Sequence, residues 1–246
     1  MWRGPAGTGV CRETGVPWKW SQGENILWTA EIPAWGNSTP VVWQDRIFLT
    51  TQDDHNDLLL ICLSKTDGRT LWTRKVGNDE APREAPRGRQ KFHPLNNLAS
   101  PSPVTDGRFV AAHFGNGDLA VFDMEGNPQW KRNLQSDYGP YSIWWGHANS
   151  PVIVGDLLIS ICIQDSLADI QERPNVSYVA AHDLETGRPV WFTERMTGAE
   201  KEHGDAYTTP LVREAEGRTE VIVMGAEQLD AYDAATGRQV WVLPGL

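Results

Sequence analysis

The stretch Ala231-Tyr232-Asp233-Ala234-Ala235-Thr236-Gly237 lies just before Trp241, and Ala181-His182-Asp183-Leu184-Glu185-Thr186-Gly187 lies just before Trp191. Both copies read A-x-D-x-x-T-G-x-x-x-W. In such a turn the Asp side chain can accept bonds from backbone N–H groups, and Gly can take a positive φ at low cost. The pattern therefore predicts a tight hairpin that pairs the strand before the turn with the strand that contains Trp.

Two looser copies precede Trp72 and Trp130. In the first, Cys62 and Ser64 replace the Ala and the Asp, and in the second, Val121-Phe122-Asp123-Met124-Glu125-Gly126, the loop is one residue shorter. Glycine stands four residues before tryptophan in every copy. Together with Trp28, five of the twelve tryptophans recur at spacings of 44, 58, 61 and 50 residues. A repeat of this length with several short strands is typical of a propeller or a solenoid.

Each copy also has a polar segment that ends in Pro and leads into an apolar strand, a short polar turn and a second apolar strand. The next apolar run, such as Leu58-Leu59-Leu60-Ile61, is the third strand, and the Trp-containing strand is the fourth. Four antiparallel strands per repeat make a propeller blade. The segments that open the blades are Asn37-Ser38-Thr39-Pro40, Ser100-Pro101-Ser102-Pro103, Ala148-Asn149-Ser150-Pro151 and Tyr207-Thr208-Thr209-Pro210.

The pattern A-x-D-x-x-x-G-x-x-x-W resembles the tryptophan-docking motif of the PQQ-like (quinoprotein-like) β-propellers. That family includes the quinoprotein alcohol dehydrogenases and the lipoprotein of the outer-membrane β-barrel assembly machinery. The resemblance covers residues from about 26 to 246, and the opening Trp2-Arg3-Gly4-Pro5-Ala6-Gly7-Thr8-Gly9-Val10 is similar to the start of exported PQQ-like repeat proteins of environmental bacteria. It implies an all-β fold, a β-propeller of four-stranded antiparallel blades.

We expect residues 1–28 to form an N-terminal segment with a lead-in strand at Trp28, and residues 29–246 to form the repeats. The predicted blades are 29–72, 73–130, 131–191 and 192–241. Members of the family close their rings with seven or eight blades, so four blades supply about half of a ring. Because an open half-ring would expose unpaired sheet faces and edges, the remaining blades are expected from a longer chain or from a second copy.

Each recurring Trp is expected near the start of an outer strand, wedged between neighbouring blades. Burying roughly 150–250 Å² of an indole stabilises a fold by about 4–6 kcal/mol at most. The residues assigned to this structural role are Trp28, Trp72, Trp130, Trp191, Trp241, Gly68, Gly126, Gly187 and Gly237.

Ligands of propellers bind along the axis, so the loops just before the inner strands are the candidate binding region. The densest is Tyr141–Asn149, where paired indoles can stack on a planar ligand and His and Asn can bond its edge. The alternative is that Trp144 and Trp145 pack between blades and that His147 is a satisfied loop histidine. The candidates for ligand binding are Trp144, Trp145, His147, Asn149, Asn37, His203 and Asp205, with Trp35, Gly36, Asn96, Asn97, Gly146 and Tyr207 beside them.

Composition excludes several classes. The formal charge of −10, with acidic and basic residues interspersed, argues against nucleic acid, which needs a clustered basic face. No apolar run is long enough for a membrane span. Cys11, Cys62 and Cys162 form no C-x-x-C pair, so no zinc knuckle or disulfide framework is predicted, although one bridge stays open.

The favoured function is a non-catalytic binding or scaffolding platform for a protein or carbohydrate partner in the cell envelope. The alternative is a dehydrogenase with PQQ and calcium on the propeller axis, for which no vicinal cysteine pair or ligand set is found in the sequence. A hydrolase or lyase that uses His147 is a third hypothesis. We assign no catalytic residue, no cofactor and no metal site. The resemblance favours a periplasmic or otherwise exported protein, although the first residues show no secretory signal and a cytoplasmic location stays open.

Overall fold

The computed structural model describes residues 3–4, 7–79, 84–85, 88–89, 96–143, 145–164 and 176–246. The predicted candidate Trp144 lies outside these ranges. The two helices of the described ranges are α1 (Leu134–Tyr138) and η2 (Lys201–Gly204). Neither has the length or the apolar character of a membrane-spanning helix.

Sixteen of the strands form four antiparallel sheets of four strands each, so the predicted all-β fold of propeller blades is confirmed. In every sheet the strands follow one another in chain order. The short strands β5 (Glu84–Ala85) and β6 (Gly88–Arg89) pair separately. The first sheet contains β1 (Val41–Trp43), β2 (Arg46–Gln52), β3 (Asp57–Ser64) and β4 (Thr70–Asn78), and the second contains β7 (Val104–Thr105), β8 (Phe109–His113), β9 (Asp118–Asp123) and β10 (Pro128–Asn133). The third sheet contains β11 (Val152–Val154), β12 (Leu157–Cys162), β13 (Tyr178–Asp183) and β14 (Pro189–Glu194), and the fourth contains β15 (Leu211–Ala215), β16 (Arg218–Gly225), β17 (Gln228–Asp233) and β18 (Gln239–Pro244).

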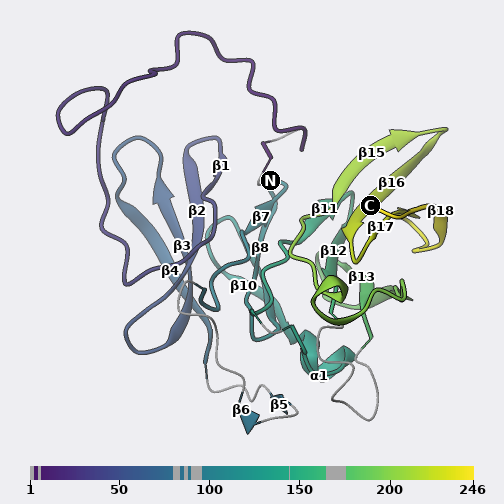
Figure 1. The fold of residues 1–246 in the computed structure, drawn as a ribbon. Coiled ribbons are helices and arrows are strands. Elements are labelled where there is room, and N and C mark those ends of the chain that lie inside the picture. Colours follow the sequence, from purple (N-terminus) through teal and green to yellow (C-terminus); the bar gives the residue numbers. More distant parts are fainter. Residues whose placement is uncertain are drawn as a thin grey trace.

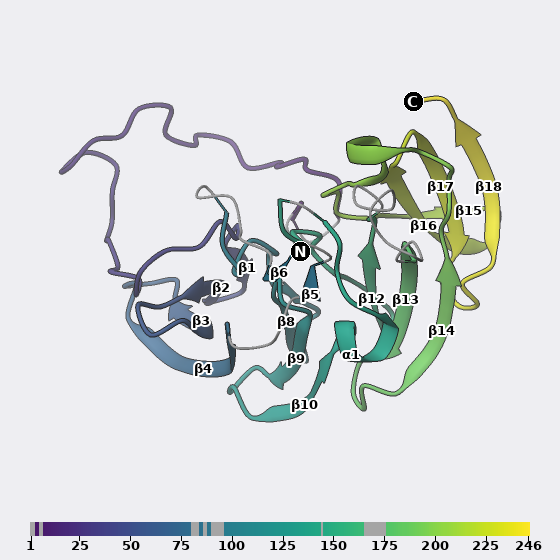
Figure 2. The same ribbon diagram turned by 60° about the horizontal axis from the view of Figure 1, so that its bottom comes forward.

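The four sheets stand side by side along an arc, with the first and the last at its two ends (Figure 1). The fourth strands β4, β10, β14 and β18 form the outer rim of the arc (Figure 2). On the inner side, β1 and β11 each contact β7. The short first strands therefore converge toward one axis, as in a propeller.

Apolar side chains fill the spaces between the sheets. Phe48 and Leu60 of the first sheet pack against Val110 and Phe122 of the second in one core cluster. A similar cluster joins the second sheet to the third, and another joins the third to the fourth. The second and third sheets each contribute apolar residues from both faces, so their strands are buried on two sides. Burial between neighbouring sheets is thus the main stabilising contribution to this fold.

The contact between a tryptophan and the turn of the next sheet is repeated four times. The Nε1 groups of Trp28, Trp72, Trp130 and Trp191 donate to the carbonyls of Lys65, Met124, Leu184 and Ala234, at 2.9, 3.0, 2.9 and 3.0 Å. Each indole also lies against the glycine of that same turn, in the order Gly68, Gly126, Gly187 and Gly237. All four glycines have a positive φ, between 69° and 80°.

The hairpin turns have the geometry that their sequences predict. Asp183 Oδ1 accepts from the backbone N–H of Thr186 at 2.8 Å and from its hydroxyl at 2.6 Å, and Asp233 does the same with Thr236. Gly187 N–H bonds the carbonyl of Asp183, four residues back, whereas Gly126 in the shorter loop bonds Asp123, three residues back. The missing residue therefore changes the closing bond and leaves the glycine in place.

The recurring Trp residues of the four sheets lie inside strands. The approximate blade limits at 72, 130, 191 and 241 fall on the third residue of β4, β10, β14 and β18, and each sheet continues past its Trp. Trp28 was expected on a lead-in strand, yet residues 25–34 form no strand. A strand needs a hydrogen-bonding neighbour, and this segment instead lays Ala30 and Ile32 against the apolar side chains Leu59, Ile61 and Leu63 on the face of the first sheet.

The contact between each indole and a turn glycine predicts that two matched substitutions lower the free energy of unfolding by different amounts. Gly187 and Gly155 both have positive φ (69° and 56°), but an added Cβ lies 2.5 Å from the Trp130 ring at the first and meets nothing within 4 Å at the second. We expect Gly155→Ala to lower the free energy of unfolding by about 1 kcal/mol, the cost of the backbone conformation. Gly187→Ala should cost about 2 kcal/mol more, because the indole must move. Urea unfolding measures both, and equal losses would show that the indole does not depend on the glycine.

Candidate functional site

The loops that precede the inner strands are joined one to the next by side chain to backbone hydrogen bonds. Asn97 Nδ2 donates to the carbonyl of Trp35 at 2.6 Å, and Asn96 Nδ2 donates to the carbonyl of Trp145 at 2.6 Å. Asn149 Nδ2 donates at 3.0 Å to two carbonyls of the loop before β15. The four loops therefore form one connected layer. This layer lies at the edge of the sheets where β4, β10 and β14 end.

Several side chains of this layer face solvent. Trp35 is 46%, Trp145 36% and Tyr207 41% exposed. The predicted candidates Asn37 and His203 are exposed as well. Large aromatic side chains with amide and imidazole groups between them suit contact with a partner, because aromatic residues offer much area at little entropic cost. We refer to Trp35, Asn37, Asn96, Trp145, His203 and Tyr207 as the loop surface.

Exposed residues of the loop surface are held in place by acidic partners. Trp145 Nε1 donates to Glu202 Oε1 at 2.9 Å, and His203 Nδ1 lies 2.8 Å from Glu227 Oε1. Glu202 and Glu227 are not among the residues predicted from the sequence. Glu202 is 57 residues from Trp145, so no local pattern pointed to it.

Two predicted candidates lie beneath this surface. His147 is fully buried, its Nε2 is 3.1 Å from the carbonyl of Ile161, and its ring stacks on Tyr141 with centroids 4.7 Å apart. Asn149 is 1% exposed, and Asp205 is half-buried. The imidazole of His147 is therefore not accessible to a substrate, and the residue is a buried loop histidine whose Nε2 bonds the backbone.

Buried imidazoles gather below the loops, and the sequence analysis identified only one of them. The rings of His113 and His147 have centroids 4.6 Å apart, and the Tyr138 hydroxyl lies 2.9 Å from Nε2 of His182. Burial, followed by the neighbouring His147, holds the pKa of His113 well below its ordinary value. Burial, with a smaller effect of Arg132, lowers the pKa of His182 to about 4. His113 and His182 therefore stay neutral in the folded protein at neutral pH.

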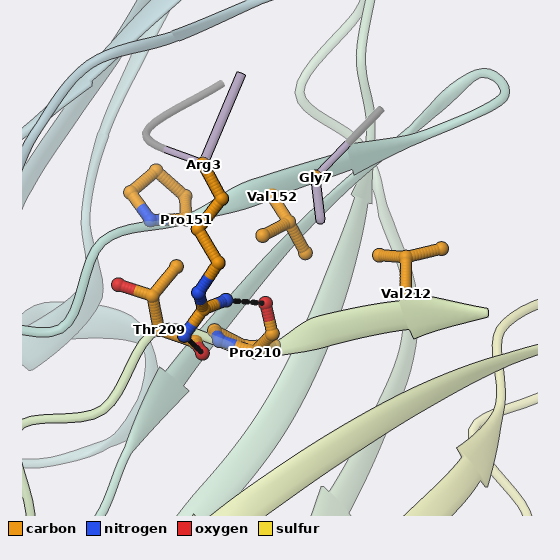
Figure 3. Close-up of a pocket in the computed structure, with 7 residues that line it drawn as sticks. All are labelled: Arg3, Gly7, Pro151, Val152, Thr209, Pro210 and Val212. Atoms are coloured by element: carbon orange, nitrogen blue, oxygen red, sulfur yellow. Dashed lines mark hydrogen bonds between the residues drawn. The ribbon is translucent and has the colours of Figure 1, made fainter. Parts of the chain in front are cut away.

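The N-terminal segment forms part of the wall of a small pocket on the inner side. The Arg3 guanidinium donates to the carbonyls of Pro210 at 3.2 Å and Thr209 at 3.1 Å, as Figure 3 shows. Val152 and Val212 line the same pocket, from the inner strands β11 and β15. From this anchor the segment crosses the molecule to the first sheet (Figure 1). Arg3 thus lines this pocket and ties the N-terminal segment to the residues just before β15.

The hypothesis of a calcium–PQQ centre requires a cluster of calcium ligands. Calcium prefers six to eight clustered oxygen ligands, and within the described ranges no group of three His, Cys, Asp or Glu residues is placed to hold a metal ion. Cys62 and Cys162 are buried in different sheets. We therefore derive no chemical step through a quinone.

The family profile of the outer membrane protein assembly factor BamB matches residues 14–198. The chain belongs to this family of PQQ-like repeat proteins. Comparison with curated proteins found no match to the sequence.

Solved propellers have the same fold. BamB from Moraxella catarrhalis matches with a TM-score of 0.54 and 16% identity, over 88% of this chain and 54% of its own. The quinohemoprotein alcohol dehydrogenase ADHIIG from Pseudomonas putida HK5 matches with a TM-score of 0.59 and 15% identity, over 88% and 35%. That of Comamonas testosteroni gives 0.62 and 13%, over 88% and 36%. The chain therefore spans about half of BamB and about a third of the dehydrogenases.

The buried imidazoles predict that the fold loses stability in mild acid. His182 has an ordinary pKa of 6.5 and a folded pKa of about 4, so below pH 6.5 the unfolded chain takes up a proton that the folded chain does not. The free energy of unfolding is therefore highest above about pH 7 and falls as the pH drops toward 4. His182 alone lowers it by about 2 kcal/mol at pH 5, and His113 lowers it further.

Urea unfolding between pH 7.5 and 5 measures this loss. His182→Gln should flatten the curve, while His55→Gln, at an exposed turn, should leave it unchanged. A wild-type protein with equal stability at pH 7.5 and 5 would contradict the prediction.

Proposed function

We propose that this chain is part of a non-catalytic β-propeller platform in the cell envelope that binds a protein partner through the loop surface. The observation that carries the proposal is the exposure of Trp35, Trp145 and Tyr207 on three loops that hydrogen bonds join into one layer. Aromatic residues of this kind provide most of the affinity of protein interfaces.

The rigidity of the layer supports a role in recognition. Asn96 and Asn97 fix the carbonyls of Trp145 and Trp35, and Glu202 fixes the Trp145 indole. Side chains that are already ordered lose little entropy when a partner binds, so more of the contact energy appears as affinity. Function in this fold is placed in loops on a rigid scaffold.

Family membership supports the cellular setting. The family takes its description from an outer membrane assembly factor, and one solved relative in fold is BamB itself. We therefore propose a periplasmic or otherwise exported location. The formal charge of −10 agrees with a partner that is not a polyanion.

A photo-crosslinking amino acid at Trp145 tests the binding surface. In the native host we expect a discrete protein adduct from position 145, and none from position 185, because Glu185 is exposed at the opposite end of β14, in the β13–β14 turn. In the purified pair, Tyr207→Ala should weaken binding at least tenfold, the typical effect of removing an interface aromatic residue, while Glu185→Ala should have no effect.

Adducts from both positions, or only from 185, would contradict the loop surface as the binding face. Adducts that a glycosidase removes and a protease does not would show a carbohydrate ligand instead.

The dehydrogenase hypothesis has its own test. Added PQQ and calcium ions should leave the melting temperature and the tryptophan fluorescence unchanged, because the described residues assemble no calcium ligand set. The measurement is a thermal scan with calcium alone as the control. A quench with a rise in melting temperature that needs both components would favour the dehydrogenase.

A further inference from the structure

Two buried histidines lie directly beneath the loop surface. His113 is the last residue of β8, and His147 belongs to the loop before β11, two residues after the exposed Trp145. Both histidine side chains are fully buried, and their ring centroids lie 4.6 Å apart. The pair therefore connects an exposed residue of the loop surface with the core between the second and third sheets.

The loop that contains His147 is held against the sheets by side chains. Residues 145–151 belong to no helix or strand. Nε2 of His147 lies 3.1 Å from the carbonyl of Ile161, and its ring stacks on the ring of Tyr141. The Tyr141 hydroxyl in turn lies 3.4 Å from Nε2 of His113. Both imidazoles thus help to fix the loop on β8 and β12.

A proton on either ring would place a positive charge in this core. Burial lowers the pKa of His113 first, followed by His147, while a backbone hydrogen bond with Asn149 raises it. Of the described groups that act most on this pKa, none is a carboxylate. The titratable side chains packed around the pair are Tyr138 of α1, Tyr141 of the loop, Cys162 of β12, and Tyr178 and His182 of β13.

Charged residues of the adjoining elements surround this core. The carboxylate of Asp118 lies 3.2 Å from Nζ of Lys131, on the face of β9 that is turned away from His113. The others are Arg132 and Asp137, which act on the pKa of His182, and Asp205 of the loop before β15. Because water solvates a charged imidazole better than this core does, each proton taken up favours a conformation in which the ring reaches water.

We propose that the His113–His147 pair is an acid-sensitive switch: a proton taken up by either ring releases residues 141–149 from the core and moves Trp145 out of the loop surface, while the four sheets stay folded. The opening stays local because no ladder of strand hydrogen bonds has to break in residues 145–151. The switch would regulate the binding surface, and that consequence rests on the proposed function. The opening itself is a property of the chain alone.

Two native cysteines can report this opening. Cys162 is buried in the core cluster that contains Tyr141 and Ile143, whereas Cys62 is buried in the cluster between the first and second sheets. With Cys11→Ser as background, a pyridyl disulfide reagent labels each thiol as it becomes exposed, and mass spectrometry of the peptides gives the two rates. Both thiols react by the same chemistry, so the ratio of the two rates removes the effect of pH on the reagent.

We expect the rate of Cys162 relative to Cys62 to rise at least tenfold from pH 7.5 to 5.5. This is the change for an opening that exposes one imidazole with the ordinary pKa of about 6.5. The double variant His113→Gln and His147→Gln should give the same ratio at both pH values, whether or not its loop is already open. His182→Gln, the control at a buried histidine within a strand, should keep the rise.

Three results would overturn the switch. Rates that rise together for Cys162 and Cys62 would show global unfolding, a rise that persists in the double variant would exclude the pair, and a rise lost in His182→Gln would assign the effect to β13. The crosslinking test at position 145 is made at neutral pH on the closed loop. A missing adduct there would therefore contradict the binding surface and leave the thiol result standing, whereas a constant ratio would contradict the switch alone.

Discussion

The packing of an indole on a positive-φ glycine in the next sheet is the constraint on which this structure depends. A side chain at that glycine would occupy the space of the ring, so the turn must combine a left-handed conformation with an exposed flat backbone. The indole N–H then finds its acceptor in the same turn, as Trp130 does with Leu184. One contact therefore sets both the distance and the rotation between neighbouring sheets, and the apolar clusters between them follow from that placement.

The sequence predicts those features whose residues are close together in the chain. It does not predict contacts between residues that are far apart in the chain. The turns and strands could be predicted because Asp, Gly and Trp lie within eleven residues of one another and each has a direct conformational role. The position of the loops before the inner strands could also be predicted from the Pro-containing segments, but the exposure of their residues could not. Whether His147 is buried depends on Tyr141 and on the carbonyl of Ile161 across the sheet. Similarly, the buried pair of Arg195 and Asp230, at 2.6 Å, joins residues 35 apart and has no sequence signature.

That buried pair shows how the loop layer is tied to the sheets. Arg195 leaves the end of β14, and its guanidinium also bonds the carbonyls of Gly225 and Gln228, at the turn between β16 and β17. A charge pair of this depth stabilises little by itself, because desolvation offsets most of the attraction, but breaking it would leave a buried charge. Its effect is to fix one arrangement of the loops above the third and fourth sheets. The loop surface thus has the order of the core below it, as a binding platform requires.

The first and the fourth sheet, at the two ends of the arc, differ in how much of their surface is covered. In a chain of repeats, stability is close to a sum over the repeats and the interfaces between neighbours. The first sheet has an interface on both faces, since the segment around Trp28 covers one of them. The fourth sheet has one apolar interface, and its other face is exposed at Met224 and Leu243. Local opening should therefore begin at β15–β18, and because Arg3 bonds the carbonyls just before β15, that opening would also release the N-terminal segment from its anchor.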